Sequence, residues 1–225
     1  CIEQRWIRDH VDVNLWPRTA SVYKNYINGR IIANLGSLKL DKVTPQDILD
    51  FYNILRSAGI RSDGKEAPLK PATILKYHHI LSSMFSCAVD WQIIDENPCS
   101  RVKPPKIPKR KPVSLDRDPA RILLRALAHE SLKYRAITVI AACTGMRRGE
   151  ILGLREDSFD FNNCSIRIDC ASTHVSGRGI ILDDPKTETS IRTVPFPESI
   201  KPLILEVIAA RNKQRENCGD KWVHT

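Results

Sequence analysis

AACTGMRRGEILGLREDSFDF, Ala141–Phe161, is the stretch that decides the fold of the second half of the chain. Its apolar start continues a pattern that predicts a buried helix over Leu132–Ala142. Thr144 and Gly145 predict where that helix stops, because glycine suits the left-handed conformation at a helix C-terminus. MRRGEILGL then predicts a new helix, so its arginines lie beside the free N–H groups of a helix start, a place that favours an anion.

Arg147 is placed to project from the surface at the start of this second helix. Its planar guanidinium can bind two phosphate oxygens at once, which the ammonium of lysine cannot do. Glu150 stands three residues later, one turn along the same face, where it can hold Arg147 in one rotamer. Spacing alone leaves an alternative open, in which Arg147 is a solvated surface arginine paired with a glutamate.

The charge balance of the chain indicates a polyanionic partner. Its 225 residues include 35 Lys and Arg against 26 Asp and Glu, a formal net charge of +9. Nucleic acid is the first partner that this balance predicts, and acidic membrane surfaces are the second. No apolar run approaches the roughly 20 residues that cross a bilayer, and the N-terminus lacks a signal-peptide pattern. The sequence therefore predicts a cytoplasmic protein that does not span a membrane.

A basic, proline-rich segment separates two differently patterned parts of the chain. VKPPKIPKRKPVS, Val102–Ser114, contains prolines that cannot continue a helix. Five basic side chains repel one another into an extended segment, here called the basic strap: Lys103, Lys106, Lys109, Arg110 and Lys111. The expected division is a domain of residues 1–102, a linker of residues 103–113 and a second domain of residues 114–225. The strap is expected to run along DNA, and a merely solvated linker is the alternative.

The first part has the apolar spacing of α-helices. Runs with this spacing lie at Val22–Ile31, Ile48–Leu55 and Ile74–Ala88. Thr44–Pro45 has the pattern of an N-cap followed by a first helical residue, and Pro71 is expected to open a helix likewise. The prediction for this part is an all-α bundle of about four helices.

The second part mixes helices with short strands. Ser114 is expected to cap a first helix, and the spacing over Ile200–Ile208 predicts a last amphipathic helix. Strand patterns occur at Cys164–Asp169, Gly179–Leu182 and Ile191–Phe196. Between the last two, the polar segment DDPKTETS is expected to form a hairpin tip around Lys186. The predicted class is an α-helical bundle followed by a partial mixed α+β domain with a small antiparallel sheet.

TGMRRGEILGL followed by DSFDF resembles the first arginine motif of the tyrosine recombinases, the family of phage and conjugative-element integrases. PKTETSIRTVPF is similar to the family segment that carries a lysine at a β-hairpin tip. GSLKLDKVTPQDI and DENPCSRVKPPK resemble parts of the family's core-binding domain and interdomain linker. The resemblance implies that Arg147 is catalytic, that Glu150 supports it, and that Lys186 is the general acid. Arg148 occupies the variable position of the motif and is expected to contact DNA.

The chemistry of this family explains why these residue types are needed. A tyrosine hydroxyl attacks a DNA phosphodiester and gives a 3′-phosphotyrosyl link and a free 5′-hydroxyl, and the step is reversed on another strand. Because the link retains the phosphodiester energy, the resemblance implies no ATP, metal or other cofactor. Arg147 would stabilise the charge on the non-bridging oxygens, and Lys186 would protonate the departing 5′-oxygen.

Some catalytic parts of the family should follow the last helix and do not occur in the 225 residues. These parts are an HxxR box, a further His or Trp, and the tyrosine nucleophile. All 5 tyrosines precede Arg147: Tyr23, Tyr26, Tyr52, Tyr77 and Tyr134. The expectation is a recombinase portion that lacks its nucleophile and is inactive alone.

The expected partner is the double-stranded DNA of an attachment site, on which the full-length protein would form a homo-oligomer, a tetrameric synapse. Lys70, Thr73 and Lys76 are spaced to share one helix face and are expected to enter the major groove, with solvated charge as the alternative. A second function class stays open. The chain could be a DNA-binding remnant or an architectural protein without catalysis.

Overall fold

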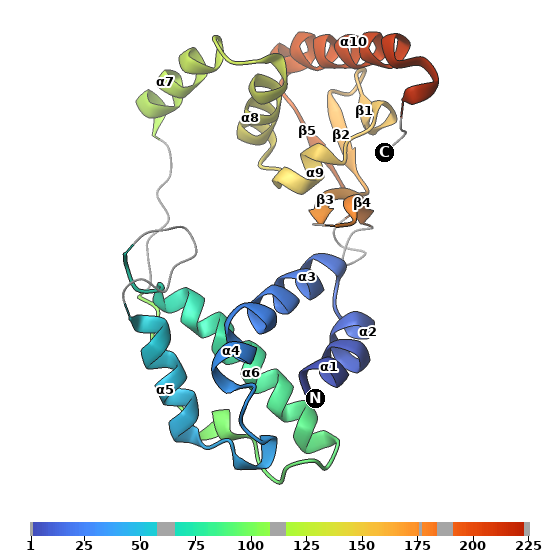
Figure 1. Ribbon diagram of the computed structural model, residues 1–225. Coiled ribbons are helices and arrows are strands. Elements are labelled where there is room, and N and C mark those ends of the chain that lie inside the picture. The colour runs from blue at the N-terminus through green and yellow to red at the C-terminus, as the bar shows by residue number, and fades with distance from the viewer. Residues whose placement is uncertain (1, 58–65, 109–115, 176, 184–190, 223–225) are drawn as a thin grey trace. The chain divides into compact units, whose positions relative to one another are not determined.

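The computed structural model describes residues 2–57, 66–108, 116–175, 177–183 and 191–222 (Figure 1). The chain divides into two compact units, Cys1–Lys111 and Pro112–Thr225. Each unit has a hydrophobic core of its own. None of the described helices is both long enough and apolar enough to cross a membrane.

The described residues of the first unit form four helical rods. Two of the rods contain a π-helical segment between α-helical ends. The first rod joins α1 (Ile2–Trp6), η1 (Ile7–Val11) and α2 (Asp12–Asn14), and the second joins α3 (Pro17–Tyr26), η2 (Ile27–Ile31) and α4 (Ile32–Leu35). The other rods are α5 (Pro45–Arg56) and α6 (Pro71–Asp90), and short 3₁₀ turns lie at η3 (Leu40–Lys42) and η4 (Pro98–Arg101). The predicted bundle of about four helices is confirmed.

Both helix starts expected from proline are also confirmed. Pro45 and Pro71 are the first residues of α5 and α6. The Thr44 hydroxyl accepts a hydrogen bond from the Asp47 backbone N–H at 3.3 Å, and the Asp47 carboxylate accepts one from the Thr44 N–H at 2.8 Å. This reciprocal pair satisfies two donors that would otherwise stay unpaired at the start of α5.

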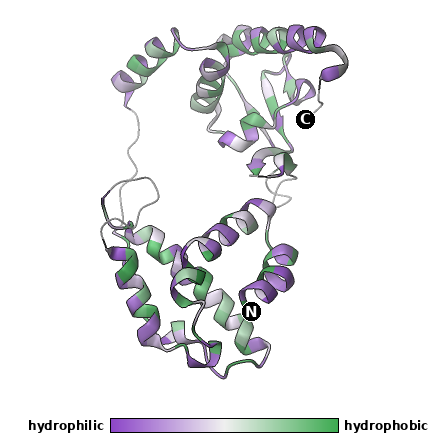
Figure 2. Ribbon diagram, in the orientation of Figure 1, coloured by the Kyte–Doolittle hydropathy of each residue, from purple (hydrophilic) through white to green (hydrophobic). Residues whose placement is uncertain are grey.

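The core of the first unit is centred on α5 and α6. Figure 2 shows hydrophobic segments along both helices. Trp6, Phe51, Tyr52 and Phe85 are almost completely buried. His78 belongs to this core as well, and its Nδ1 lies 2.7 Å from the Tyr52 hydroxyl. Its burial and this contact make His78 part of the packing between α5 and α6.

In the part that the structure describes, the second unit contains helices and two small antiparallel sheets. Its helices are α7 (Arg117–Leu127), α8 (Leu132–Thr144), α9 (Arg148–Leu152) and α10 (Lys201–Cys218), with 3₁₀ turns η5 (Glu156–Ser158), η7 (Glu198–Ile200) and η8 (Gly219–Lys221). Its strands are β1 (Phe159–Asp160), β2 (Ser165–Ile168), β3 (Ala171–Val175), β4 (Gly179–Asp183) and β5 (Arg192–Pro195). One sheet has the order β1-β2-β5 and the other pairs β3 with β4. The predicted mixed α+β class with a small antiparallel sheet is confirmed.

The predicted hairpin around DDPKTETS is wrong in its strand pairing. Among the described residues, β4 pairs with β3, and β5 pairs with β2, where Ile166 lies opposite Val194. The sequence reading missed β3, which follows β2 after two residues and offers β4 a nearer partner. Lys186 and the rest of residues 184–190 lie outside the described residues.

Helix α8 is less buried than its apolar sequence predicts. Only Ala136 and Ile140 are buried in it. Ile137 and Ile140 line an apolar groove of about 520 Å³, whose walls also include Ile204 and Ile208 of α10. The predicted helix is present, but the expectation that it is buried is only partly right. Ser114 was expected to cap the preceding helix, α7. It lies outside the described residues, and α7 starts at Arg117.

Candidate functional site: an arginine clamp at the start of α9

The turn between α8 and α9 exposes Arg147. Gly145 ends α8 in the left-handed conformation, with φ 65° and ψ 15°. Met146 then enters the core of the second unit, where it is 5% exposed. Arg147 follows in an extended conformation as the N-cap of α9. The glycine reverses the chain, the methionine anchors it, and the next side chain is consequently directed outward.

Two glycines let α9 lie close to strand β3. A Cβ atom on Gly149 would come within 3.2 Å of the Ser172 carbonyl oxygen, and one on Gly153 within 3.1 Å of the Ala171 Cα. Both distances are tighter than ordinary van der Waals contact, so a side chain at either position would push the helix away. The glycines of RRGEILGL therefore fix where the helix and its N-cap arginine lie on the sheet.

Glu150 is a buried carboxylate that receives four hydrogen bonds. Its side chain is only 8% exposed. One oxygen, Oε1, accepts from Arg147 Nη1 at 2.8 Å and from Arg192 Nη1 at 3.1 Å. The other, Oε2, accepts from the Arg147 backbone N–H at 2.9 Å and from Arg192 Nη2 at 2.8 Å. The expected Arg147–Glu150 contact is therefore present in the structure, and the carboxylate has a donor on each side.

The environment of Glu150 keeps it ionised. Burial alone would raise the pKa of Glu150, because it penalises the charged form. The hydrogen bonds from Arg192 and then from Arg147 outweigh burial and lower the pKa from its ordinary 4.5 to about 2. The contact with Glu150 in turn raises the pKa of Arg192. The three side chains thus form an ion cluster with two positive charges and one negative charge.

Arg147 is the outer member of this cluster. Its side chain is 78% exposed, compared with 36% for Arg192. Arg147 uses Nη1 to contact Glu150 and makes no other side-chain hydrogen bond to the described residues. A guanidinium has five N–H donors, so most of its donors are directed to solvent. This geometry suits the binding of a phosphate by two charge-assisted hydrogen bonds.

Arg192 is the member of the cluster that sequence reasoning missed. It is the first residue of β5 and lies 42 positions after Glu150. The sequence predicts a strand over Ile191–Phe196, and no local spacing connects its arginine with α9. The one signal for this contact is the position of Arg192 at the start of a half-buried strand, because a partly buried arginine usually needs an acidic partner.

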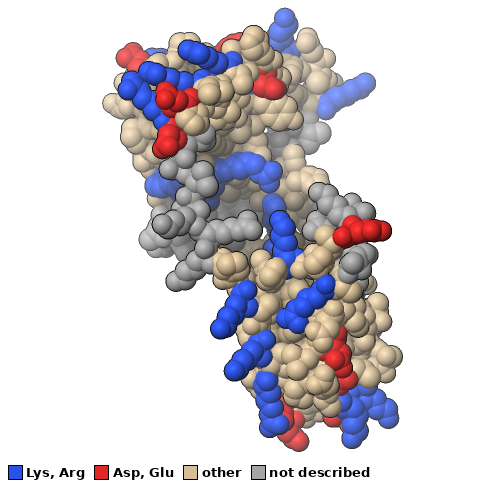
Figure 3. Space-filling model, turned by 90° about the vertical axis from the view of Figure 1, so that its left-hand side faces the viewer, with Lys and Arg blue, Asp and Glu red and all other residues tan. Residues whose placement is uncertain are grey.

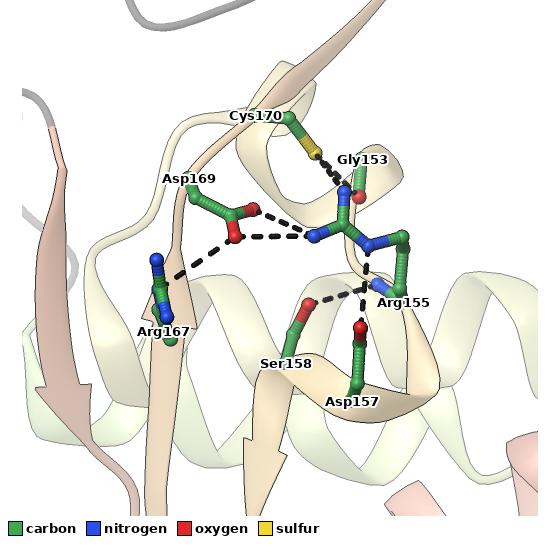
Figure 4. Close-up of polar contacts among 7 residues, drawn as sticks. All are labelled: Gly153, Arg155, Asp157, Ser158, Arg167, Asp169 and Cys170. Atoms are coloured by element: carbon green, nitrogen blue, oxygen red, sulfur yellow. Dashed lines mark hydrogen bonds and ion pairs between the residues drawn. The ribbon is translucent and has the colours of Figure 1, made fainter.

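A second polar network holds the other end of α9 (Figure 4). Arg155 lies just beyond the helix, and its Nη2 contacts both carboxylate oxygens of Asp169 at 3.3 and 3.1 Å. Arg155 Nε also donates to Asp157 at 3.2 Å, and the Cys170 thiol donates to the Gly153 carbonyl at 3.0 Å. The network connects the segment after α9 with the end of β2. Both ends of α9 are consequently tied to the sheet.

Most of the other described residues that are expected to contact DNA have exposed side chains. Lys70 is the exposed N-cap of α6, Thr73 is half-buried, and Lys76 is exposed. Arg148 is exposed at the first position of α9. Lys103 and Lys106 of the basic strap are exposed, whereas Lys109, Arg110 and Lys111 lie outside the described residues. On the face drawn in Figure 3, Lys and Arg side chains clearly outnumber Asp and Glu side chains.

Among the described residues, no group of three or more His, Cys, Asp or Glu side chains is arranged to hold a metal ion. The cations that contact Glu150 are the guanidinium groups of Arg147 and Arg192.

Replacing Glu150 with glutamine is expected to destabilise the second unit by about 3 kcal/mol at pH 7, because two guanidinium groups lose their counter-charge. The folded-state pKa of Glu150 lies below its ordinary value, so its contribution is fully present above about pH 4.5 and decreases as the pH falls towards 2. Urea unfolding at pH 7 and pH 3 should therefore give a smaller difference between wild type and Glu150→Gln at pH 3.

Glu206→Gln is the matched control for this prediction. Glu206 pairs with Arg135 at 2.6 Å, but its side chain is 55% exposed, and its removal should cost less than about 1 kcal/mol. An equal loss for Glu150→Gln at both pH values would contradict the role given to its ionised form.

Comparison with known proteins finds relatives among tyrosine recombinases and integrases. Residues 3–56 match the family model described as the phage integrase N-terminal SAM-like domain. The chain is 30% identical over 212 residues to a tyrosine recombinase XerC-like protein of Caldanaerobacter subterraneus subsp. tengcongensis, covering 86% of this chain and 49% of that protein. It is 24% identical over 201 residues to the ICEBs1 integrase of Bacillus subtilis, covering 89% and 52%. The chain thus spans about half the length of these curated relatives.

Solved structures share the fold. The Tn1549 transposon integrase in complex with a circular intermediate DNA aligns with a TM-score of 0.75 at 22% identity, over 92% of this chain and 64% of that one. The lambda integrase tetramer bound to a Holliday junction aligns with a TM-score of 0.58 at 18% identity, over 81% and 49%. These alignments include both units of the chain and agree with the predicted fold class.

Proposed function

Because the chain belongs to the tyrosine recombinase family, which includes the phage integrases, we propose that it takes part in site-specific recombination of DNA. The proposed reaction integrates or excises a mobile element by cutting and rejoining DNA strands. The recombinase and integrase relatives match 86% and 89% of the chain, and this coverage supports the proposal.

The proposed cleavage step starts when a tyrosine hydroxyl attacks the phosphorus of a DNA phosphodiester. The new bond joins the tyrosine oxygen to phosphorus while the bond from phosphorus to the 5′-oxygen breaks. The tyrosine hydroxyl gives its proton to a base or to water, and the departing 5′-oxygen gains one from a general acid. The product is a 3′-phosphotyrosyl link that retains the phosphodiester energy, so that a 5′-hydroxyl of another strand can reverse the step without ATP.

Arg147 is proposed to stabilise the transition state of this step. Negative charge increases there on the non-bridging oxygens, and two N–H groups of one guanidinium can donate to both of them. The observation that carries the proposal is the cluster itself, in which a 78% exposed arginine is held by a carboxylate that is 8% exposed. Preorganisation of this kind is useful to a catalyst, because the donor does not have to reorient during the reaction.

Lys186 is proposed as the general acid that protonates the 5′-oxygen. The support is the resemblance of PKTETSIRTVPF to the lysine-bearing segment of the family. Strand β5, which follows this segment, begins with Arg192 in contact with Glu150, so the chain after Lys186 is tied to the arginine cluster.

DNA binding is proposed for both units. Residues 1–102 would form the core-binding domain, residues 103–113 the linker, and residues 114–225 the front part of the catalytic domain. Lys70, Thr73 and Lys76 would contact DNA from the start of α6, and Arg148 from the start of α9. The lambda integrase structure, a tetramer bound to a Holliday junction, supports the further proposal that the full-length protein acts as a homo-oligomer on its DNA.

A DNA-binding protein without catalysis is the second candidate, supported by the exposed basic side chains of Lys70, Lys76, Lys103 and Lys106. None of the 5 tyrosines in these residues follows Arg147. We propose accordingly that the 225 residues alone bind DNA and do not cleave it. The two candidates differ in one measurable property, since a recombinase carrying these residues forms a covalent protein–DNA adduct and a binding protein does not.

Replacing all five residues of the basic strap with alanine is expected to flatten the salt dependence of DNA binding. Five neutralised phosphates would contribute roughly 4 to 5 to the slope of log affinity against log salt concentration. Fluorescence anisotropy with a labelled duplex at several salt concentrations measures this slope.

Lys42→Ala and Arg101→Ala are matched controls for the strap. Both side chains are exposed, and each already pairs with an acidic residue, Asp41 and Glu96 respectively. Their loss should leave the slope nearly unchanged. A slope that stays the same after neutralising the strap would remove the strap from the DNA interface.

A further inference from the structure

The carboxylate of Glu150 is shared by two arginines from different parts of the second unit. Arg147 belongs to the start of α9, and Arg192 belongs to the start of β5, opposite Ile168 of β2. Each arginine donates to both carboxylate oxygens, but in different ways. Arg147 uses one side-chain and one backbone N–H, whereas Arg192 uses two N–H groups of its guanidinium.

The contact from Arg192 fixes the plane of the carboxylate. Its Nη1 and Nη2 lie 3.1 and 2.8 Å from Oε1 and Oε2, the two-point geometry that a planar guanidinium forms with a carboxylate. Arg147 Nη1 binds the same Oε1 at 2.8 Å. Because that oxygen is the one side-chain partner of Arg147 among the described residues, the orientation of the carboxylate sets the direction of the Arg147 guanidinium.

Arg192 is the more buried of the two arginines, as expected of a residue that holds the carboxylate in place, and Arg147 is the more exposed, as expected of one that binds a ligand. Arg192 is 36% exposed and Arg147 is 78% exposed, with the 8% exposed Glu150 joining them. Arg147 therefore has little packing of its own to restrict its rotamers, and a long side chain of this kind loses considerable entropy when it is ordered. A carboxylate held by Arg192 supplies this order before any ligand binds.

We infer that Arg192 is a positioning residue for Arg147, acting through the Glu150 carboxylate to aim the exposed guanidinium at a scissile phosphate. This inference rests on the proposed function, because it assigns Arg192 a part in that same site. Arg192 itself does not touch the reacting atoms. Its contribution is to restrict the carboxylate, and through it Arg147, to one orientation.

A double-mutant cycle on strand cleavage tests this inference. The protein used carries these residues together with the tyrosine of the family, and single-turnover cleavage of a nicked suicide substrate is measured at saturating DNA. Arg192→Gln should slow cleavage by about 10- to 100-fold, the loss typical when a residue that orients a functional group through hydrogen bonds is removed. In an Arg147→Ala background the same change should have less than about a twofold effect, because its target is gone.

Two further variants separate positioning from folding. Arg192→Lys keeps the charge and should recover part of the rate, although lysine cannot form the two-point contact. Arg135→Gln removes an arginine of α8 that pairs with Glu206 of α10 at 2.6 Å, away from the arginine cluster. It should lower the midpoint of urea unfolding and leave the cleavage rate of the folded protein unchanged.

The 225 residues alone allow a measurement that does not depend on cleavage. In two-dimensional NMR of the arginine Nε–H groups, Arg147 should give a dispersed signal that shifts on addition of inorganic phosphate. Arg192→Gln should move this signal towards the solvent-averaged position and weaken the response to phosphate. An unchanged Arg147 signal in Arg192→Gln would overturn the inference.

The outcomes of the cycle distinguish the inference from the proposed function. Equal slowing by Arg192→Gln in both backgrounds, or no slowing in either, overturns the positioning role while leaving recombination intact. If Arg147→Ala itself cleaves at the wild-type rate, both the proposed function of Arg147 and the inference about Arg192 fail.

Discussion

Arg147→Ala is expected to slow DNA strand cleavage by about 100- to 1,000-fold, equivalent to about 3 to 4 kcal/mol of lost transition-state stabilisation. The guanidinium is held at the start of α9 by the buried Glu150, and most of its donors face solvent. Its charge-assisted hydrogen bonds would strengthen as charge develops on the phosphate oxygens. Duplex affinity should fall much less, because one phosphate contact among many contributes little to binding.

The measurement compares two quantities for the same variant. Single-turnover cleavage of a nicked suicide substrate reports the chemical step, and fluorescence anisotropy reports affinity. Arg147→Lys should remain slow, since an ammonium keeps the charge but loses the planar fork. Arg148→Ala is an informative contrast, because its exposed side chain is expected to affect affinity and not the rate at saturating DNA. Parallel losses of affinity and rate in Arg147→Ala would assign this arginine to binding alone.

Lys186→Ala is expected to slow cleavage by about 100- to 10,000-fold, the range found for general acids and bases. The departing 5′-oxygen is a strong base and needs a proton as its bond to phosphorus breaks. A substrate with sulfur at the 5′-bridging position leaves without a proton, so this substrate should restore much of the lost rate.

The sulfur substrate also provides the control. It should rescue Lys186→Ala and should not rescue Arg147→Ala, because stabilisation of the non-bridging oxygens is still required. Failure of the sulfur substrate to rescue Lys186→Ala would remove this lysine from the general-acid role.

The elements with a strong local signal could be predicted from the sequence. Helix α6 has apolar residues at helical spacing and a proline at its first position, and nine of its residues are buried. Gly145 was expected in the left-handed conformation and has a φ of 65°. In both cases the deciding physics lies within a few residues of chain, either the period of the helix or the freedom of glycine.

The strand pairing could not be predicted, because it depends on contacts between distant segments. Strand β3 reads ASTHV, which offers only one buried apolar side chain, Val175. The polar segment 184–190 looked like a hairpin tip because strand patterns flank it on both sides. In the structure β4 pairs with β3 and β5 pairs with β2. Period-2 patterns identify strands without identifying their partners.

The candidate site was predictable only in part, for the same reason. Arg147 and Glu150 are one helical turn apart, so their pairing follows from helix geometry. Arg192 reaches Glu150 through the long-range packing that pairs β5 with β2, which no local pattern in the sequence indicates. Helix α8 was expected to be buried from its composition, but a face of it lines the apolar groove that it shares with α10.

The most direct test of recombinase function is covalent trapping on a nicked suicide substrate in the presence of a metal chelator. The chain extended through the HxxR box and tyrosine of the family should give a protein–DNA adduct on a denaturing gel, and the 225 residues alone should bind the same DNA without an adduct. Arg147→Ala should greatly reduce the amount of adduct formed in a fixed time. The absence of an adduct from the extended, DNA-bound protein would contradict the account, and an adduct formed by the 225 residues alone would show that the nucleophile lies elsewhere.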